Sequence, residues 1–510
     1  MNNKALRVIA RSLPLIIILI VAIFFRLHNL TTTPPGLYPD EAMNGNNALE
    51  AIASHDFKVF YPENNGREGL FINLQAFVIM ATGMIHEPWV LRLVSALFGI
   101  ATIVGAYCAV KQMLKKYSFA NYAALASAFF MAISFWHVNF SRIGFRAIMA
   151  PFFMIGALYL LSYALEQLNE KSNPRVGWTL LALGGIVYGL GMHSYIAYRA
   201  TPLIIIFFFC AYWLLTQRAS FKKLFVQASV FVLFSLVVFA PLGIYFAQNP
   251  SDFLGRTSQV SVASSSHPFV DFLSNCAKTV GMFFWQGDGN WRHNYNGAPQ
   301  LYWIVGALFA LGFFYAARLL NKKAFAEKKD EVLFWWTMIC WLVVASLPVV
   351  ISNEGIPHAL RSILMIPPVF CMAGAAVARF RESAQSFVSR KYLLDIGLGC
   401  IALIMVFQAY HQYFILWGEN QNTKDAFDVY SVTLGHTLNG LPKETPKYIV
   451  VNQGGVLVRD VPMPSQTVMF ITDSFTSQKQ QEKNIRYVLE KNEASIPKDA
   501  SHFYLDPKKQ

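Results

Sequence analysis

The sequence predicts an all-α polytopic membrane protein that ends in a small α+β segment. Three observations lead to this prediction. Of the 510 residues, 55% are hydrophobic and only 14% are charged, well below the roughly 25% charged residues of soluble domains. The mean hydropathy is +0.38, and apolar runs long enough to cross a roughly 30 Å hydrocarbon layer recur along most of the chain. The last part, 417–510, is instead polar and only weakly patterned.

About eleven transmembrane helices are expected. The segment 70–85, "LFINLQAFVIMATGMI", is short and contains Asn73 and Gln75. With this segment at the outer interface, as a juxtamembrane helix, every strongly basic loop falls on the cytoplasmic side, as the positive-inside rule requires. The expected spans are 13–27, 90–110, 119–137, 147–166, 178–193, 200–217, 224–246, 301–319, 332–351, 362–378 and 393–416.

This threading defines two parts of the chain. Residues 1–416 form a transmembrane domain with a first outer loop at 28–89 and a long outer loop at 247–300. Residues 417–510 form an extracytoplasmic region in which "KYIVV" and "TVMFIT" are predicted strands. The N-terminus is cytoplasmic and the C-terminus is outside, in a plasma (inner) membrane. The net charge of +13 is explained by cytoplasmic loops, so nucleic acid is not an expected partner.

An adjacent acidic pair, Asp40 and Glu41, follows the first predicted span in "GLYPDEAMNGNNA". Carboxylates at the outer surface of such an apolar chain suggest acid–base chemistry. The structural alternative is that Asp40 only caps the helix that begins at Glu41.

Arginine predominates among the outer cations before residue 417, whereas the inner loops are rich in lysine. Guanidinium presents a planar fork of donors that suits phosphate and carboxylate, and ammonium is a hydrated point charge. Pairing with a carboxylate or a lipid headgroup explains any single arginine equally well, but the whole set favours an anionic ligand at the outer leaflet. The set consists of Arg26, Arg67, Arg142, Arg146, Arg199, Arg256, Arg292 and Arg361.

Polar and aromatic residues accompany these arginines on the outer side. The long loop contains a polar-aromatic cluster of a kind that binds sugar hydroxyls and rings, or that pairs internally as a structured loop. In "MHSYIAYR" the aromatic residues are equally explained as an interfacial belt. The candidate substrate residues, besides the arginines, are Glu68, His137, His193, Tyr195, Tyr198, Asp288, Asn290, Trp291, His293, Asn294 and His358.

Several common catalytic motifs are absent from the sequence. It contains no HExxH, Cys-x-x-Cys, phosphate-cradling glycine loop or Gly-x-Ser-x-Gly elbow. Their absence argues against a zinc protease, a nucleotide-driven enzyme and a serine hydrolase. No ligand spacing identifies a metal site, so no cofactor is assigned and a divalent cation stays open.

The order of these features resembles the GT-C glycosyltransferases, most nearly the protein O-mannosyltransferase and aminoarabinose transferase group. The acidic pair in the first outer loop, "NNGREGLF", "FSRIGFRAI", "RTSQVS" and "NWRHNYNGAP" carry the resemblance over roughly residues 10–415. "GREG" stands where the aminoarabinose transferases have a Lys-Pro-Pro-like element, so their sugar and acceptor are not carried over.

The resemblance implies a polyprenyl-phosphate-linked sugar donor and inverting transfer to an extracytoplasmic acceptor, either protein, lipid or glycan. It also implies that Asp40 is the general base, and that Glu41 orients Asp40, binds the acceptor or helps to hold a cation. Displacement at the anomeric carbon also requires charge stabilisation on the departing phosphate, for which the candidates are Arg142, Arg146, Arg199 and Arg361.

Two other classes of protein stay open from the sequence. A transporter or flippase for lipid-linked anionic glycans also needs an outer arginine cluster, although span centres almost free of charge leave it no obvious polar path. A non-catalytic scaffold in envelope assembly would use 417–510 as its binding module.

Overall fold

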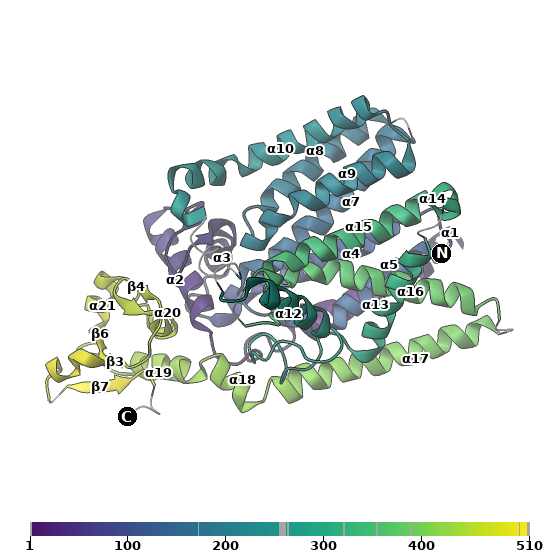
Figure 1. Ribbon diagram of the computed structural model, residues 1–510. Coiled ribbons are helices and arrows are strands. Elements are labelled where there is room, and N and C mark those ends of the chain that lie inside the picture. Colours follow the sequence, from purple (N-terminus) through teal and green to yellow (C-terminus); the bar gives the residue numbers. More distant parts are fainter. Residues whose placement is uncertain are drawn as a thin grey trace.

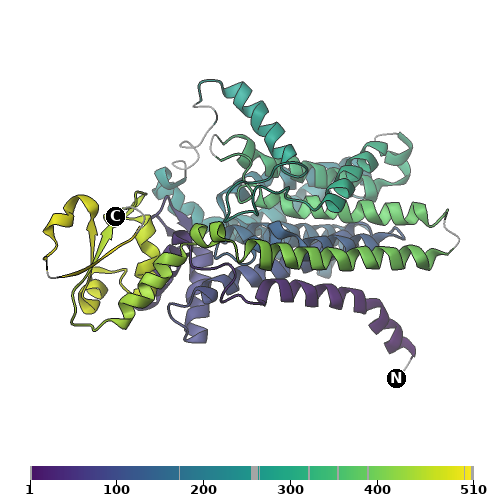
Figure 2. The ribbon, with the colours of Figure 1, turned by 90° about the horizontal axis from the view of Figure 1, so that it is seen from below.

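The structure is a computed structural model that describes residues 3–171, 173–253, 262, 265–319, 322–352, 355–387, 390–498 and 500–506. Long helices pack side by side in one bundle, and a small region with strands lies at one end of it (Figure 1). The N-terminus lies at the opposite end of the bundle from these strands, as Figures 1 and 2 both show.

The first half of the bundle begins with α1 (Asn3–Leu27), α2 (Pro39–Ser54), α3 (Gly69–Thr82), α4 (Pro88–Met113), α5 (Ala120–Ile133) and α6 (Phe135–Phe140). It continues with α7 (Met149–Asn169), α8 (Pro174–Gly191), α9 (Pro202–Thr216) and α10 (Phe221–Gln248). The second half contains α12 (Pro268–Gly281), α13 (Trp303–Arg318), α14 (Lys322–Glu327), α15 (Lys329–Val350), α16 (Ile366–Ala384) and α17 (Lys391–Tyr410).

Among the described residues, seven helical stretches are long and apolar enough to cross a membrane, which supports a multi-pass protein. They are Pro88–Met113, Arg146–Asn169, Ile196–Thr216, Phe221–Gln248, Lys329–Val350, Ile363–Ala384 and Tyr392–Trp417. Shorter apolar helices occupy Ser12–Leu27, Gly69–Thr82, Ala120–Ile133 and Trp303–Arg318. Every expected span coincides with helix, although the total of eleven crossings stays a prediction.

One expected span is interrupted. The range 119–137 contains the end of α5 at Ile133 and the start of α6 at Phe135. Ser134 between them is extended (φ −61°, ψ 125°), and its hydroxyl accepts a hydrogen bond from the backbone N–H of His137. Ser134 is therefore the N-cap of a new helix.

The helix α16 lies at the centre of the bundle. The apolar window of α16 is 89% buried, whereas that of α17 is 11% buried. A Cβ at Gly374 of α16 would lie 2.4 Å from the backbone nitrogen of Ser127 on α5. Glycine therefore permits a close approach of the two backbones, as small residues do between membrane helices.

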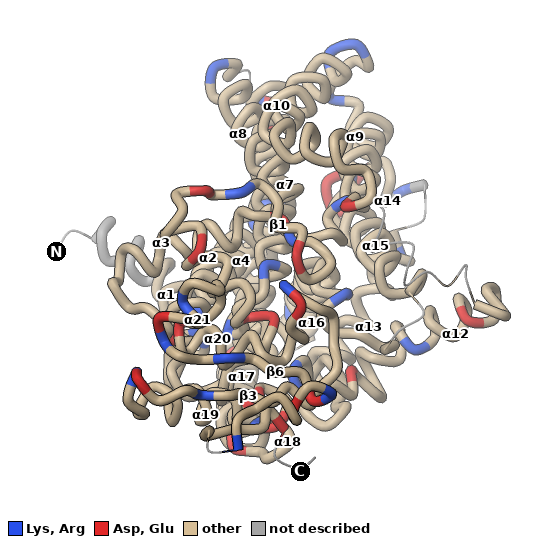
Figure 3. The backbone as a smooth tube through the Cα atoms, turned by 90° about the vertical axis from the view of Figure 1, so that its left-hand side faces the viewer, with Lys and Arg blue, Asp and Glu red and all other residues tan. Residues whose placement is uncertain are grey.

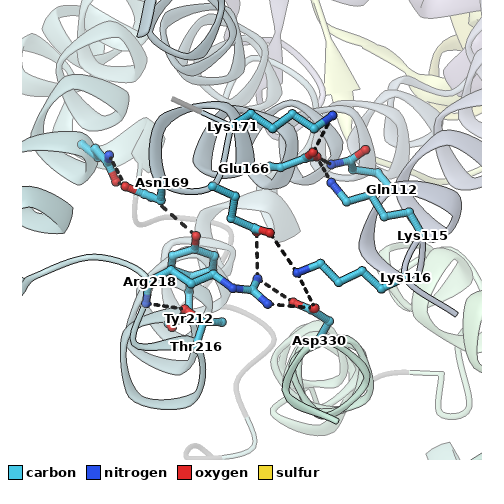
Figure 4. A network of polar contacts seen from close by, with 12 residues as sticks. Gln112, Lys115, Lys116, Glu166, Asn169, Lys171, Tyr212, Thr216, Arg218 and Asp330 are labelled. Atoms are coloured by element: carbon cyan, nitrogen blue, oxygen red, sulfur yellow. Dashed lines mark hydrogen bonds and ion pairs between the residues drawn. The ribbon is translucent and has the colours of Figure 1, made fainter. Parts of the chain in front are cut away.

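A polar network connects helix ends at the end of the bundle that also carries α14. Arg218 contacts Asp330 with both terminal nitrogens, at 2.7 and 2.8 Å, and Glu170 at 2.9 Å (Figure 4). Glu166 pairs with Lys115 and Lys171 in the same network. These cations belong to loops that the sequence assigns to the cytoplasm, and the fold gathers them at one end.

The first outer loop packs on the other end of the bundle. It contains α2, α3 and a short hairpin of β1 (Phe60–Tyr61) and β2 (Arg67–Glu68). Gly36, at φ +65°, precedes α2, and a Cβ there would lie 2.4 Å from the carbonyl oxygen of Phe427. Glycine is thus required both by the backbone conformation and by the contact with the C-terminal region.

The C-terminal region begins with α18 (Gln421–Ala426) and α19 (Val429–Gly440) and contains a parallel sheet of order β6-β3-β7. The sheet strands are β3 (Lys447–Val451), β6 (Ile485–Leu489) and β7 (Ser501–Tyr504), and β4 (Leu457–Val458) and β5 (Val461–Pro462) form a separate hairpin. The helices α20 (Gln466–Thr472) and α21 (Ser477–Lys483) complete it.

Of the two strands predicted in this region, one is confirmed and one is wrong. "KYIVV" is β3, the central strand of the sheet, but "TVMFIT" lies within the helix α20. Every residue of α20 is buried, and a short apolar run that is buried on all sides has no periodicity to distinguish helix from strand. α20 packs against α2, where Asn46 donates to the Oε1 atom of Gln466 at 2.9 Å.

Candidate functional site

The two adjacent acids at the start of α2 have different surroundings. Tyr38 is the N-cap and Pro39 the first helical residue, so Glu41 is the third residue, and its Oε1 accepts from the backbone N–H of Tyr38 at 3.4 Å. Glu41 is fully buried in an ion pair with Arg92 of α4, at 2.9 Å, and also accepts from the N–H of Gly144 at 2.7 Å. The Glu41 side chain therefore has little capacity for another ligand.

Asp40 instead lies in the wall of a cavity. Its side chain is half-buried, and Oδ1 accepts a hydrogen bond from the Nδ2 of Asn64 at 2.7 Å. Asp40 lines a cavity of about 90 Å³ together with Asn64, Arg67, Arg146 and Tyr195. A carboxylate and two guanidinium groups thus share one small space.

Arg67 lies at the base of this cavity with an unused donor. Its side chain is buried, and one terminal nitrogen donates to Asn44 at 2.7 Å and the other to Asn47. The Nε atom is buried and has no hydrogen-bond partner. Burial and, next, the charge of Arg146 lower the pKa of Arg67 to about 10. An anion in the cavity would reduce the repulsion between the two arginines.

Glu68 connects two further arginines. Arg146 donates to it at 2.7 Å, and Arg199 lies 3.7 Å from its other oxygen. Burial alone would raise the pKa of Glu68, but the charges of Arg146 and Arg199 outweigh burial and lower it. One carboxylate therefore serves two guanidinium groups, and with Arg67 the group has an excess of positive charge. Figure 3 shows basic and acidic residues side by side on this end of the molecule, around α2 and α3.

A second cavity lies on the other side of Asp40. It has a volume of about 340 Å³ and is lined by Tyr38, Asp40, Asp425, Asp428 and Gln453, among others. Except for the start of α2, its walls come from the C-terminal region. Asp40 lies between this acidic cavity and the arginine cavity.

Several residues predicted for the site lie elsewhere. Arg142 is fully buried and donates to the carbonyl oxygens of Phe25, His28 and Thr33. His137 is fully buried with its Nδ1 2.8 Å from a guanidinium nitrogen of Arg26. Both residues brace the end of α1 and do not line the Asp40 cavity.

Of the predicted residues in "MHSYIAYR", some line the Asp40 cavity and others do not. Tyr195 lines the Asp40 cavity and lies 5.8 Å from the Arg146 guanidinium. Tyr198 is buried against Tyr188, and His193 contacts the carbonyl oxygen of Val238 at 3.0 Å. Arg256 lies outside the described residues.

The long outer loop pairs largely with itself and with its neighbours. Arg292 stacks on the ring of Tyr38 at 3.8 Å, and Asn294 donates to the carbonyl oxygen of Asp288 at 3.1 Å. The backbone carbonyl of Trp291 accepts a hydrogen bond from Trp417, and that of Arg292 accepts one from Asn139. The Oδ1 of Asn290 accepts from the backbone N–H of Arg292. Outside this loop, Arg361 hydrogen-bonds to Ser352.

Within the described part of the chain, one group of residues has the composition of a metal site. Asp288, His293 and His358 offer ligand atoms that all lie within 4.8 Å of one another. A cation shared by Asp40 and Glu41 does not fit, because Glu41 is fully buried in an ion pair with the Arg92 guanidinium. A divalent cation is thus compatible with this protein, at Asp288.

Two residues of the site were missed in the sequence. Asn64, the partner of Asp40, lies in "ENNGREG", a stretch rich in polar side chains that does not identify which of them meets the acid. Arg92 is a single charge near the start of the expected span 90–110, and such a residue requires a partner. This isolated charge was the signal that could have identified the Glu41 pair.

The comparisons with known proteins concern structure alone, since no family model and no curated protein sequence matches this chain. The oligosaccharyltransferase of Archaeoglobus fulgidus in its apo form is similar with a TM-score of 0.58 and 14% identity, over 91% of this chain and 64% of that chain. ArnT from Cupriavidus metallidurans bound to undecaprenyl phosphate is similar with a TM-score of 0.55 and 14% identity, over 91% of this chain and 84% of that chain.

A third structure is that of the archaeal oligosaccharyltransferase AglB from Archaeoglobus fulgidus with an inhibitory peptide and a dolichol-phosphate. Its TM-score is 0.55 at 14% identity, over 91% of this chain and 63% of that chain. The chain spans a little less than two thirds of the archaeal enzyme's length. These neighbours are GT-C membrane glycosyltransferases, and the resemblance expected from the sequence is confirmed at the level of the fold.

Proposed function

We propose that this protein is a membrane glycosyltransferase that moves a sugar from a polyprenyl-phosphate-linked donor to an acceptor on the extracytoplasmic side. The observation that carries the proposal is the position of Asp40 between an arginine-lined cavity and an acidic cavity. A displacement reaction requires such an arrangement, with a base toward the acceptor and positive charge toward the leaving group.

In this proposal the donor phosphate occupies the cavity beside Arg67, Arg146 and Arg199. The two neighbouring guanidinium groups of Arg67 and Arg146 in one cavity support this assignment, as do the lipid phosphates in two of the similar structures. The arginines neutralise the charge that develops on the phosphate as the bond to the sugar breaks. Arg142 is not assigned to the phosphate, because its guanidinium donates to the carbonyl oxygens of Phe25, His28 and Thr33, and Arg361 is not needed by this proposal.

The acceptor approaches through the cavity between α2 and the C-terminal region. Asp40 removes the proton from the acceptor hydroxyl or amine, and the freed electron pair forms the new bond to the anomeric carbon. The phosphate leaves from the opposite face with the electron pair of the broken bond, so the configuration inverts. Glu41 does not touch the acceptor but holds the start of α2 through Arg92, which keeps Asp40 in place.

The proposal is tested by Asp40→Asn in the purified protein, reconstituted in sealed liposomes with a panel of polyprenyl-phosphate sugars and envelope extract as acceptor. Loss of the base should lower the release of polyprenyl phosphate about a hundredfold or more. The matched control is Asp56→Asn, an exposed acid of the same outer loop, which should keep full turnover.

The same liposomes separate the alternatives. A flippase would move the labelled lipid across the bilayer without cleaving the bond between phosphate and sugar. A scaffold would do neither. Undiminished turnover in a folded Asp40→Asn protein would remove Asp40 from the role of base.

A further inference from the structure

Asp288 and His293, which are buried, and His358, which is half-buried, form a cluster outside the Asp40 cavity. The Nδ1 of His293 lies 2.9 Å from the Oδ2 of Asp288, and the Nδ1 of His358 lies 3.8 Å from the same oxygen. The two imidazole rings are 5.0 Å apart between centroids. In the sequence, His358 is far from the other two residues, so no ligand spacing could reveal the cluster.

We propose that Asp288, His293 and His358 bind a zinc ion that connects the long outer loop to the segment between α15 and α16. Imidazole nitrogen and carboxylate oxygen are usual zinc ligands, at about 2.0–2.2 Å from the ion. Two such ligands at a tetrahedral ion are roughly 3.3 Å apart. The Nδ1 of His293 is hydrogen-bonded to Asp288 at 2.9 Å, and the Nδ1 of His358 lies 3.8 Å from the same oxygen. All the ligand atoms lie within 4.8 Å of one another, so the imidazoles would rotate inward to close the site on an ion.

The carboxylate is already oriented by the surrounding backbone. Asp288 accepts from the N–H of Asn290 at Oδ1 and from the N–H of Ala359 at Oδ2, each at 2.8 Å. Hydrogen bonds of this kind hold a ligand in position before the metal arrives. The bond to Ala359 also crosses between the two segments that the ion would join.

Two guanidinium groups, those of Arg292 and Arg361, lie near the histidines of the cluster. Their charges oppose a cation, and the negative charge of Asp288 offsets part of that repulsion.

Such an ion would position the walls of the Asp40 cavity without contacting the reacting groups. Leu360, two residues after His358, lines that cavity. Arg292, next to His293, stacks on Tyr38, the N-cap of α2. Zinc would thus hold both segments against the start of α2.

The test measures zinc binding to the purified full-length protein and does not depend on any transferase activity. After treatment with a chelator, the protein is supplied with zinc alone, and bound metal and the thermal midpoint are recorded. We expect about one zinc per chain and a higher midpoint for the wild type. His293→Asn and His358→Asn should lose both effects, and the exposed control His436→Asn should keep them.

A second variant covers the case in which the asparagine variants fail to fold. His358→Cys retains a zinc ligand, so cobalt added to this variant should produce a thiolate-to-cobalt charge-transfer band that the wild type lacks. A wild type that takes up no zinc, equal zinc content in the His293→Asn and His358→Asn proteins, or a folded His358→Cys protein without the band would each overturn the proposal.

Discussion

Asp40 and Glu41 show how one step along a helix separates two chemical roles. Successive side chains on an α-helix are rotated by about 100°. Glu41 therefore points into the protein toward Arg92, where both side chains are fully buried, and Asp40 faces the cavities. An adjacent acidic pair in a sequence is thus one accessible acid and one structural acid here.

The predicted outer arginines also divide into residues that line a cavity and residues with a structural role. This division leads to a prediction. Arg146→Ala should weaken donor binding about tenfold, because it removes a charge-assisted contact worth roughly 1.5 kcal/mol. Arg142→Ala should leave donor affinity nearly unchanged and lower the thermal midpoint, because the carbonyls of Phe25, His28 and Thr33 lose their donor. Competition with a fluorescent polyprenyl phosphate and thermal unfolding measure the two effects.

Arg459→Ala is the control for this pair. Arg459 of the C-terminal region bridges Glu50 and Glu63 at 2.7 and 2.8 Å and does not line the Asp40 cavity. It should change neither measurement by much, since exposed ion pairs contribute little. Normal donor affinity in a folded Arg146→Ala protein would contradict the phosphate site.

At the scale of elements, α2 is held in place by partners from several parts of the chain. Its N-terminus pairs with α4 through Glu41 and Arg92, and its middle packs on α20, where Gly45 leaves room for the ring of Phe470. A buried ion pair with its hydrogen bonds complete costs little, but the removal of one partner leaves an uncompensated charge.

The ion pair between α2 and α4 gives a prediction at this scale. Arg92→Met should destabilise the protein by about 3–5 kcal/mol, because it strands the Glu41 carboxylate in the interior. The double variant Arg92→Met with Glu41→Gln should recover part of this loss. Thermal unfolding of the wild type, the two single variants and the double variant in detergent forms a double-mutant cycle. Strictly additive changes in stability would show that the pair is not coupled.

Element boundaries also show where sequence patterns are sufficient. In the spans, apolar residues continue over many positions, so the predicted positions of the spans agree with the helices of the structure. "TVMFIT" is too short for a period to be read, and only its packing between α2 and α19 selects a helix. The break at Ser134 is a local capping signal that was hidden inside an apolar run.

At the scale of the whole molecule, the proposed reaction requires one orientation in the membrane. The start of α2, the arginine cavity and the C-terminal region lie together at one end, and α14 and the start of α15, where Asp330 binds Arg218, lie at the other (Figure 1). Thiol labelling of intact cells tests this orientation. Asn492→Cys and Lys328→Cys, at exposed positions, are introduced separately into a protein without other cysteines.

An impermeant reagent should label Asn492→Cys in intact cells and Lys328→Cys only after permeabilisation. Labelling of both positions after permeabilisation is the control that each is accessible. Labelling of both in intact cells, or of Lys328→Cys alone, would place the arginine cavity in the wrong compartment for a donor presented from the outer leaflet.

The sequence by itself determined the class of fold, the approximate course of the spans and the importance of the acidic pair, because hydropathy, lysine-rich loops and a polar outer loop are local properties of the chain. Tertiary structure decided which acid and which arginines face a common cavity, and it brought Asp288, His293 and His358 together. These outcomes depend on contacts between residues far apart in the chain, such as Glu41 with Arg92 and Asp288 with Ala359. A periodic pattern contains no information about such contacts, since burial and pairing are decided only when the helices pack.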